Sequence, residues 1–223
     1  MNQKIAIVTG AAGGIGRSIV NQLVKDDLQV VAFDLNKNGL SRLETEFESI
    51  EAKYGGIDAL VNNAGDCFMS EFPEISAEEF ELQMKVNFSS AFYCCKFAVK
   101  SMLNRPGIKK IVNISSNGAY NFDVFDPPHY RASKAALDNL TKDLARRYAK
   151  AGISVNSIAP AMTQTPLFDV LSKETLDKAI SQMPRGTAMK PEEIAAWVGF
   201  LISPAGDVSS GNVIILNQGR DVR

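Results

Sequence analysis

Short apolar runs alternate with amphipathic stretches along the whole chain. The apolar runs are rich in β-branched residues and carry charge only at their ends, as expected of strands covered on both faces. They predict six strands, at Lys4 to Val8, Leu28 to Phe33, Asp58 to Val61, Lys110 to Ile114, Ile153 to Ile158 and Asn212 to Leu216. The amphipathic stretches predict helices at Ile15 to Lys25, Leu40 to Tyr54, Ala77 to Leu103, Tyr130 to Lys150 and Pro191 to Leu201. This alternation is typical of an α/β protein with a Rossmann-like, doubly wound parallel sheet.

Length and charge narrow the class of protein. A chain of 223 residues with 45% hydrophobic side chains can bury a substantial core, and we expect residues 1–223 to form a single domain. The formal net charge of -1, without a basic tract, predicts neither a nucleic-acid partner nor a membrane partner. The first apolar run is too short for a signal peptide or a membrane span, so we expect a cytoplasmic protein.

Cysteine and histidine are scarce. Cys67, Cys94 and Cys95 suggest neither a disulfide framework nor a zinc site, and we expect reduced, mostly buried thiols. His129 is the only histidine, which disfavours a Ser-His-Asp triad and a cage of several histidines around a metal. We therefore expect no metal site and no hydrolase.

The first predicted strand runs into a glycine-rich turn, Thr9 to Arg17. Glycines permit positive φ and let backbone amides approach a pyrophosphate, which a helix N-terminus favours. A tight turn is the alternative, but the strand before it, the helix after it and Asp34 favour a dinucleotide site. Asp34 lies eighteen positions after Gly16, where a carboxylate can bind ribose hydroxyls and repel a 2′-phosphate. This favours NAD(H) over NADP(H), although Arg17 or Lys37 could still serve a phosphate.

Tyr130 and Lys134 lie four residues apart and so share one face of a predicted helix. A nearby cation would lower the pKa of the tyrosine from about 10 toward a range useful for proton transfer. The spacing alone also arises by chance. Ser115 and Ser116 end a buried strand, at the sheet edge where ligands bind and where a hydroxyl can orient a reacting oxygen.

Several motifs, in order, resemble the short-chain dehydrogenase/reductases: T-G-x-x-x-G-I-G from Thr9, Asn62-Asn63-Ala64-Gly65, Ser116, Tyr130-x-x-x-Lys134 and Pro191-Glu192-Glu193. The sequence is most similar to the 3-oxoacyl-[acyl-carrier-protein] reductase branch and related alcohol dehydrogenases. The resemblance implies that Tyr130 is the general acid/base, that Lys134 tunes it and holds the nicotinamide ribose, and that Ser116 orients the carbonyl. It also implies a proton relay through water at Asn87. The implied cofactor-binding residues are Gly10, Gly14, Ile15, Gly16, Asp34, Asn62, Ala64, Gly65, Tyr130, Lys134 and, at the nicotinamide amide, Thr165.

The sequence departs from this family at three places. Only twenty-eight positions separate Asp34 from Asn62, so one βα unit is missing, and losing the edge strand three would leave strand two as the new edge. The loss removes a loop that flanks the adenine and predicts weakened cofactor affinity. Ser116 lies fourteen positions before Tyr130, one more than is usual, and the acidic, aromatic loop from Asn121 to Pro128 is expected to shape the substrate pocket. Ala161 and Asn217-Gln218-Gly219 replace glycine and Asp-Gly-Gly, which would change loop geometry only.

We therefore expect an enzyme that transfers hydride between NAD(H) and a secondary alcohol or ketone. The alternative is a catalytically weak NAD-sensing or partner-binding protein that kept the fold. The stripe Leu137, Leu140, Leu144 and Tyr148 is either core or an interface, and the family resemblance implies a homodimer or homotetramer. Asp66, Cys67 and Phe68 are expected near the substrate, and Leu167 to Met183 is expected to form a mobile lid.

Overall fold

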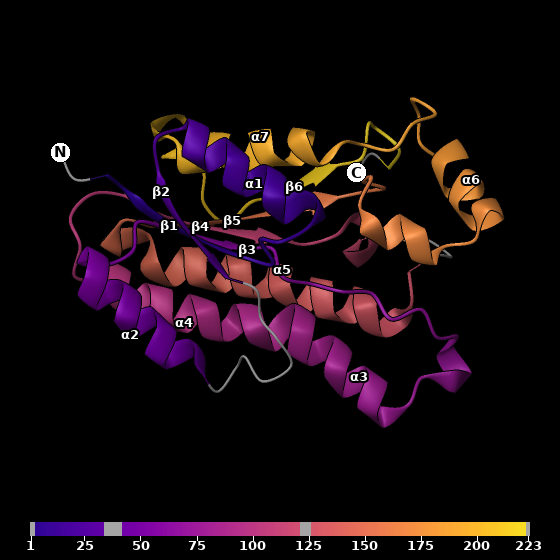
Figure 1. The fold of residues 1–223 in the computed structure, drawn as a ribbon, viewed down its shortest axis with the longest axis horizontal. Helices are drawn as coiled ribbons and strands as arrows, with labels where there is room; N and C mark the ends of the chain where they lie inside the picture. The colour runs from indigo at the N-terminus through magenta and orange to yellow at the C-terminus, as the bar shows by residue number, and fades with distance from the viewer. Residues whose placement is uncertain (1–2, 34–41, 121–125, 222–223) are drawn as a thin grey trace.

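The computed structural model describes residues 3–33, 42–120 and 126–221. A six-stranded, wholly parallel sheet runs through the molecule in the order β2-β1-β3-β4-β5-β6 (Figure 1). All six predicted strands are confirmed, each within two residues of its expected bounds. The observed strands are β1 (Ile5–Thr9), β2 (Gln29–Phe33), β3 (Ala59–Asn62), β4 (Lys109–Ile114), β5 (Ile153–Pro160) and β6 (Val213–Leu216).

The strand order puts the crossover point of the sheet between β1 and β3. Val8 in β1 pairs with Ala32 of β2 on one side and with Val61 of β3 on the other. Ligands of such sheets bind outside the carboxyl ends of the strands at this point. In the part of the chain that the structure describes, β2 is an edge strand, as expected for a sheet that has lost the family's third strand. Asp34 and Lys37, two of the three residues proposed to discriminate between nucleotides, lie outside the described residues, whereas Arg17 lies in the helix that follows β1.

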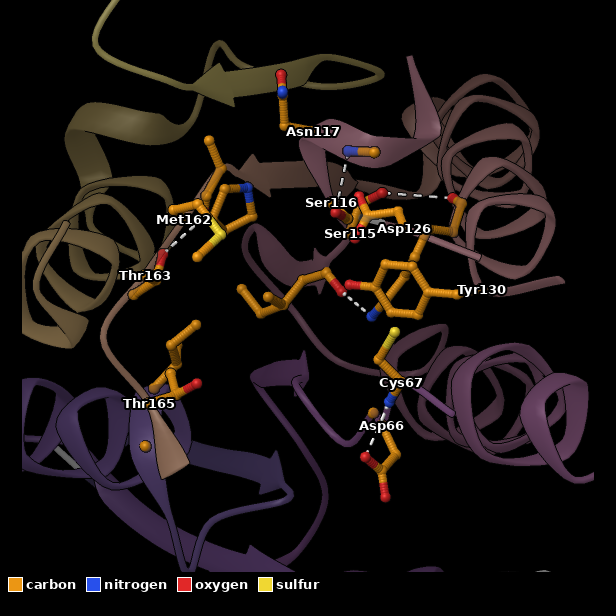
Figure 2. Close-up of a pocket in the computed structure, with 18 of the residues that line it drawn as sticks. Asp66, Cys67, Ser115, Ser116, Asn117, Asp126, Tyr130, Met162, Thr163 and Thr165 are labelled. Carbon is orange, nitrogen blue, oxygen red and sulfur yellow. Dashed lines mark hydrogen bonds between the residues drawn. The ribbon is translucent and has the colours of Figure 1, made fainter. Parts of the chain in front are cut away.

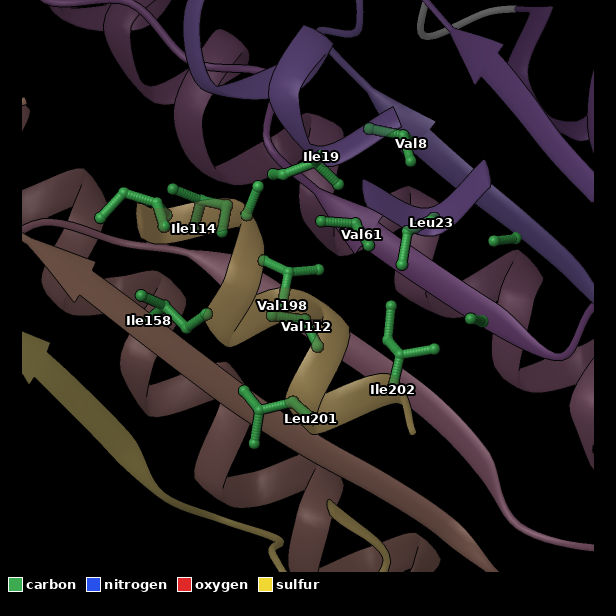
Figure 3. Close-up of a cluster of buried hydrophobic side chains, with 14 of the residues drawn as sticks. Val8, Ile19, Leu23, Val61, Val112, Ile114, Ile158, Val198, Leu201 and Ile202 are labelled. Atoms are coloured by element: carbon green, nitrogen blue, oxygen red, sulfur yellow. The ribbon is translucent and has the colours of Figure 1, made fainter. Parts of the chain in front are cut away.

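Helices cover both faces of the sheet (Figure 1). Helices α1 (Gly14–Lys25) and α7 (Pro191–Ile202) lie on one face, and α2 (Leu43–Tyr54), α4 (Ser90–Met102) and α5 (Pro128–Tyr148) lie on the other. Successive side chains of a strand point to opposite faces of the sheet. Val8 therefore packs in the first core layer, under α1 and α7, and Ile7 packs in the second, under α2, α4 and α5. Figure 3 shows the first layer, where Ile19 and Leu23 of α1 pack near Val198 of α7.

The predicted helix from Ala77 to Leu103 is interrupted. It is observed as α3 (Ala77–Met84), a π-helical turn (Lys85–Ser89) and α4. The Ser76 hydroxyl caps α3 by accepting a hydrogen bond from the Glu79 amide at 3.1 Å, as the sequence indicates. The carboxylate of Glu79 meets the Ser70 hydroxyl at 2.6 Å and Nε2 of His129 at 3.2 Å, and so ties α3 to the start of α5.

One helix was not foreseen. Within the segment from Leu167 to Met183, for which the sequence suggested a lid, the chain forms α6 (Lys173–Ser181). Its N-cap Ser172 accepts a hydrogen bond from the Thr175 amide at 3.1 Å. Across the described ranges, no helix combines the length and the apolar character that crossing a membrane requires.

Two neighbouring residues of α1 allow a test of which side chains form the core. The side chain of Leu23 is fully buried, whereas Val24 is 56% exposed. We expect Leu23→Ala to lower the free energy of unfolding by about 2–5 kcal/mol, because it leaves a cavity between α1 and the sheet. Val24→Ala should change it by less than about 0.5 kcal/mol. Urea denaturation of both variants measures the difference, and equal losses would contradict this assignment of the core.

Candidate active site

A cavity of about 610 Å³ opens at the carboxyl ends of β1, β3, β4 and β5 (Figure 2). Its volume lies in the range of small-molecule sites. The wall is built from the turn after β1, the turn after β3, the end of β4, the start of α5 and the segment after β5. The residues singled out in the sequence that line it include Gly10, Gly13, Gly14, Ile15, Asn63, Ala64, Gly65, Asp66, Cys67, Ser115, Ser116, Asp126, Tyr130, Lys134, Ala161 and Thr165.

The turns after β1 and β3 are bound tightly to each other. The Asn63 side chain donates hydrogen bonds to the carbonyl oxygens of Thr9 at 3.2 Å and Gly10 at 2.8 Å. The Thr9 hydroxyl accepts in return from the amides of Asn63 at 3.1 Å and Ala64 at 3.0 Å. Gly10 has a φ of 62°, and a Cβ there would lie 2.7 Å from Cα of Ala64. Only glycine fits at this position.

The N-terminus of α1 faces the cavity without a competing acceptor. Its N-cap, Gly13, provides no side-chain hydrogen bond, and its first turn contains no acidic residue. The unsatisfied amides of such a helix end are suited to a phosphate group. Gly14 has a φ of 47°, and a Cβ there would touch Thr165 at 3.3 Å. This end of the cavity therefore fits the pyrophosphate of a dinucleotide.

Gly16 acts from behind the cavity wall. It is buried in α1, and a Cβ there would collide with the carbonyl oxygen of Gly10 and lie 2.6 Å from Nδ2 of Asn63. Gly16 is thus not on the wall of the cavity, and it lets α1 approach the turn after β1.

The predicted proton-transfer residues come together at the other end of the cavity. Tyr130 lies in the first turn of α5, and Nζ of Lys134 lies 5.9 Å from the centre of its ring. The Lys134 ammonium donates a hydrogen bond to the carbonyl oxygen of Ile114 at 2.9 Å. Ser116, just after β4, forms a hydrogen bond with Tyr130, and its hydroxyl accepts from the Gly118 amide at 3.0 Å.

The electrostatics of this group correct one expectation. Burial, and then the carboxylate of Asp126, raise the pKa of Tyr130 above its ordinary value, while the hydrogen bond from Ser116 opposes them. The prediction that a nearby cation would lower this pKa is therefore wrong, because the desolvation of a buried phenolate outweighs the attraction. Burial lowers the pKa of Lys134 to about 8, opposed by the carboxylate of Asp138. At neutral pH the phenol keeps its proton and the lysine is a cation.

Asn87 lies behind the cavity and not on its wall. It is fully buried in the π-helical turn, where its Nδ2 donates to the carbonyl oxygen of Asp66 at 2.9 Å and to the Ser133 hydroxyl at 3.1 Å. Its Oδ1 accepts from the Asp66 amide at 2.8 Å. Asn87 therefore holds the turn after β3 against α5. A Cβ on Gly65 would lie 3.4 Å from its Oδ1 and 3.1 Å from Nζ of Lys134, so that turn passes close to both.

Asn62 also has a supporting position. Its Nδ2 donates to Oδ1 of Asn113 at 2.8 Å and meets Sγ of Cys95 at 3.2 Å, beneath the cavity. Phe68, expected near the substrate, is not among the lining residues, and its amide binds Oε1 of Gln83 at 3.0 Å. The three cysteines are free and buried, as predicted.

Two residues that the sequence did not single out take part in the site. Asp138 is buried on α5, one turn after Lys134, and its carboxylate accepts from the Ser115 hydroxyl at 2.8 Å. Burial raises the pKa of this carboxyl, and hydrogen bonds from Ser157, Tyr120 and Ser115 oppose the rise. Its spacing from Lys134 was the available signal. Arg220, near the end of the chain, lines the cavity, and no local pattern marks it.

Known proteins match nearly the whole chain. A family described as enoyl-(acyl carrier protein) reductase matches residues 41–221, and one described as short chain dehydrogenase matches residues 4–52. The chain is 31% identical to an acetoacetyl-CoA reductase of Cupriavidus necator over 98% of both chains. It is 30% identical to the 3-oxoacyl-[acyl-carrier-protein] reductase FabG of Thermotoga maritima over 97% of both.

Solved structures agree with the fold. Ligand-free aldohexose dehydrogenase of Thermoplasma acidophilum superposes with a TM-score of 0.88 and 29% identity, covering 100% of this chain and 95% of the other. The structure of gox2181 gives a TM-score of 0.91 at 24% identity, covering 99% and 96%, and so supports the fold alone.

This chain belongs to the short-chain dehydrogenase/reductase family. Within it, the chain falls in the branch similar to the 3-oxoacyl-[acyl-carrier-protein] reductases. It is an oxidoreductase that depends on a nicotinamide nucleotide and transfers hydride between that nucleotide and a small molecule with an alcohol or carbonyl group. The reading as a sensor or partner-binding protein is not favoured.

Two glycines of the turn after β1 provide a matched test of the nucleotide end. We expect Gly16→Ala to lower the free energy of unfolding by about 1–3 kcal/mol and to weaken nucleotide binding, because the added methyl group forces Gly10 to move. Gly13→Ala should cost less than about 1 kcal/mol, since its Cβ would meet nothing within 4 Å. Thermal denaturation and nucleotide fluorescence measure both effects. Unchanged affinity in Gly16→Ala would show that this contact does not set the turn.

Proposed function

We propose that this enzyme interconverts a ketone and a secondary alcohol with NAD(H), and that Tyr130 is its general acid/base. The convergence of Ser116, Tyr130 and Lys134 on the cavity that also borders the N-terminus of α1 supports this assignment. The catalytic residues and the residues at the N-terminus of α1 follow strands of the same sheet. We therefore place nucleotide binding and proton transfer in a single domain, residues 1–223. A cytoplasmic location belongs to the same proposal.

The residues divide the chemistry among them. Ser116 and Tyr130 hold the carbonyl oxygen by hydrogen bonds, and Tyr130 donates its proton to that oxygen as the alcohol forms. The phenol is protonated at neutral pH, as a proton donor must be, but its raised pKa makes it a weaker acid than a free tyrosine. Lys134, as a cation beside the ring, stabilises the phenolate left behind. The nicotinamide, when bound, supplies or removes the hydride.

Supporting residues set the geometry of this group. Gly10, Gly14, Ile15, Ala64, Gly65 and Thr165 surround the path of the dinucleotide, with Gly16 and Asn62 behind them. Asn87 positions the turn after β3, and a proton relay through water at its amide remains part of the proposal. The preference for NAD(H) rests on Asp34 alone, whose carboxylate would repel the 2′-phosphate of NADP(H).

We also propose a homodimer or homotetramer. Phe92 and Tyr93 on α4 are 42% and 40% exposed, and Trp197 and Phe200 on α7 are 41% and 47% exposed. Each pair has its rings within 6.1 Å of each other, so two aromatic patches face outward on opposite sides of the sheet. Burial of such patches between copies of the chain is favourable.

The role of Tyr130 is tested by Tyr130→Phe. We expect the rate of carbonyl reduction to fall by about 10²–10⁴-fold, because the phenyl ring fills the same space but has no proton to donate. Nucleotide binding, followed by fluorescence, should be kept. Stopped-flow oxidation of the reduced nucleotide measures the rate, and a variant that reduces ketones as fast as the wild type would exclude Tyr130 as the acid.

The choice of nucleotide is tested by titration with NADH and NADPH. We expect the wild type to bind NADH more tightly and Asp34→Ala to gain affinity for NADPH, because the repulsive carboxylate is removed. The matched control is Asp26→Ala, an exposed acid at the far end of α1, which should leave both dissociation constants unchanged. Tighter binding of NADPH by the wild type would overturn the preference and point to Arg17 or Lys37.

A further inference from the structure

A carboxylate lies at the substrate end of the cavity that the proposed proton transfer does not use. Asp126 lines this cavity directly before Pro127 and Pro128. A residue before proline is restricted to extended conformations, and Pro127 itself has a φ of -60° and a ψ of 148°. Helix α5 begins at Pro128, so only three residues separate Asp126 from Tyr130. The backbone therefore places Asp126 close to Tyr130, at the start of α5.

Two independent observations place the Asp126 carboxylate against the reacting group. A Cβ on Gly118 would collide with Oδ2 of Asp126 and would lie 3.3 Å from Oγ of Ser116, so both oxygens lie against Gly118. The charge of Asp126 also raises the pKa of Tyr130 and that of the Cys67 thiol, in each case as the largest contribution after burial. Figure 2 shows Asp126 beside Ser116 and Tyr130.

The surroundings of this carboxylate determine how strongly its charge acts on a ligand. The cavity wall includes the apolar side chains of Met69, Met162, Phe168 and Leu171, and two cations, Lys134 and Arg220. Cys67 adds no second negative charge, because burial raises the pKa of its thiol to about 12 and keeps it neutral. In a cavity of this kind, a carboxylate strongly favours hydrogen-bond donors on the ligand and disfavours a second anion.

We propose that Asp126 selects carbonyl substrates that carry a hydroxyl or ammonium group on the carbon next to the carbonyl, and rejects those in which that carbon is itself a carboxylate. The proposal rests on the proposed function, since Ser116 and Tyr130 must hold the carbonyl oxygen. A substrate anchored by that oxygen at Ser116 has its neighbouring carbon in the part of the cavity that Asp126 also lines. The substrate class is thus an α-hydroxy or α-amino ketone.

Three ketones of similar size test this selection. Hydroxyacetone has the donor, 2-butanone lacks it, and pyruvate carries the anion. We expect the wild type to use hydroxyacetone with a kcat/KM about tenfold or more above that for butanone, the effect of one hydrogen bond to a charged group, and to use pyruvate least. In Asp126→Ala the ratio of hydroxyacetone to butanone should fall close to one. In Asp126→Asn pyruvate should gain most, because the charge is lost while an acceptor remains.

The ratio between substrates separates selection from catalysis. Removing the charge of Asp126 also shifts the pKa of Tyr130, but that change affects all three ketones alike and cancels in the ratio. Gly118→Ala gives a second route to the same end, since its methyl group displaces the carboxylate, and φ at Gly118 is not in the left-handed region. We expect it to lose the preference as Asp126→Ala does, and the double variant to lose no more.

Binding to Tyr130→Phe distinguishes failure of this proposal from failure of the proposed function. This variant keeps Asp126 but cannot donate the proton, and with the reduced nucleotide bound it should bind hydroxyacetone about tenfold more tightly than butanone, as measured by quenching of nucleotide fluorescence. Equal affinities there, or a wild type without preference for hydroxyacetone, would overturn the role of Asp126. Full turnover by Tyr130→Phe would overturn the proposed function and leave the binding preference to be judged by itself.

Discussion

The close approach of two backbone turns, after β1 and after β3, is the constraint on which the rest of the site depends. The Asn63 side chain and the Thr9 hydroxyl together satisfy four backbone groups across this junction. Buried polar groups left without partners are costly, so the junction has little freedom to open. Gly10 lies where no side chain fits, and Gly16 lets the first helix press against the turn from behind. The nucleotide end of the cavity is therefore a product of main-chain packing.

The proton-transfer end is organised differently, by side chains on one long helix. Tyr130, Lys134 and Asp138 follow one another at one-turn intervals on α5, and serines at the end of β4 bind both the first and the last of them. The lysine contacts a carbonyl oxygen of the same strand. The mutual position of α5 and β4 thus fixes all the charges of this group at once. A shift of either element would disturb binding and proton transfer together.

Much of this could be predicted from the sequence, because its strongest signals are local. Buried parallel strands are continuous apolar runs, and all six were recognised; the glycine turn and the Tyr130 and Lys134 pair were placed on the correct elements. Long-range burial could not be read in the same way. The direction of the pKa shift of Tyr130 depends on desolvation and on Asp126, and the polar support from Asn63 and Asp138 depends on which strands are neighbours. The α6 helix was missed although Leu176, Ala179 and Ile180 have the spacing of one helix face, because at nine residues it is too short for this periodicity to stand out.

The π-helical turn between α3 and α4 makes the site sensitive to chain length as well as to side-chain identity. A π turn holds one more residue than the regular helix around it. The wider turn takes up this residue, so α3 and α4 remain in the phase of one continuous helix. Deleting one residue from Lys85–Ser89 would close the turn and withdraw Asn87 from the turn after β3, whereas Glu79 would stay beside Ser70 and His129. The extra residue therefore lets a single helix present a polar side chain that regular α-helical spacing would place elsewhere.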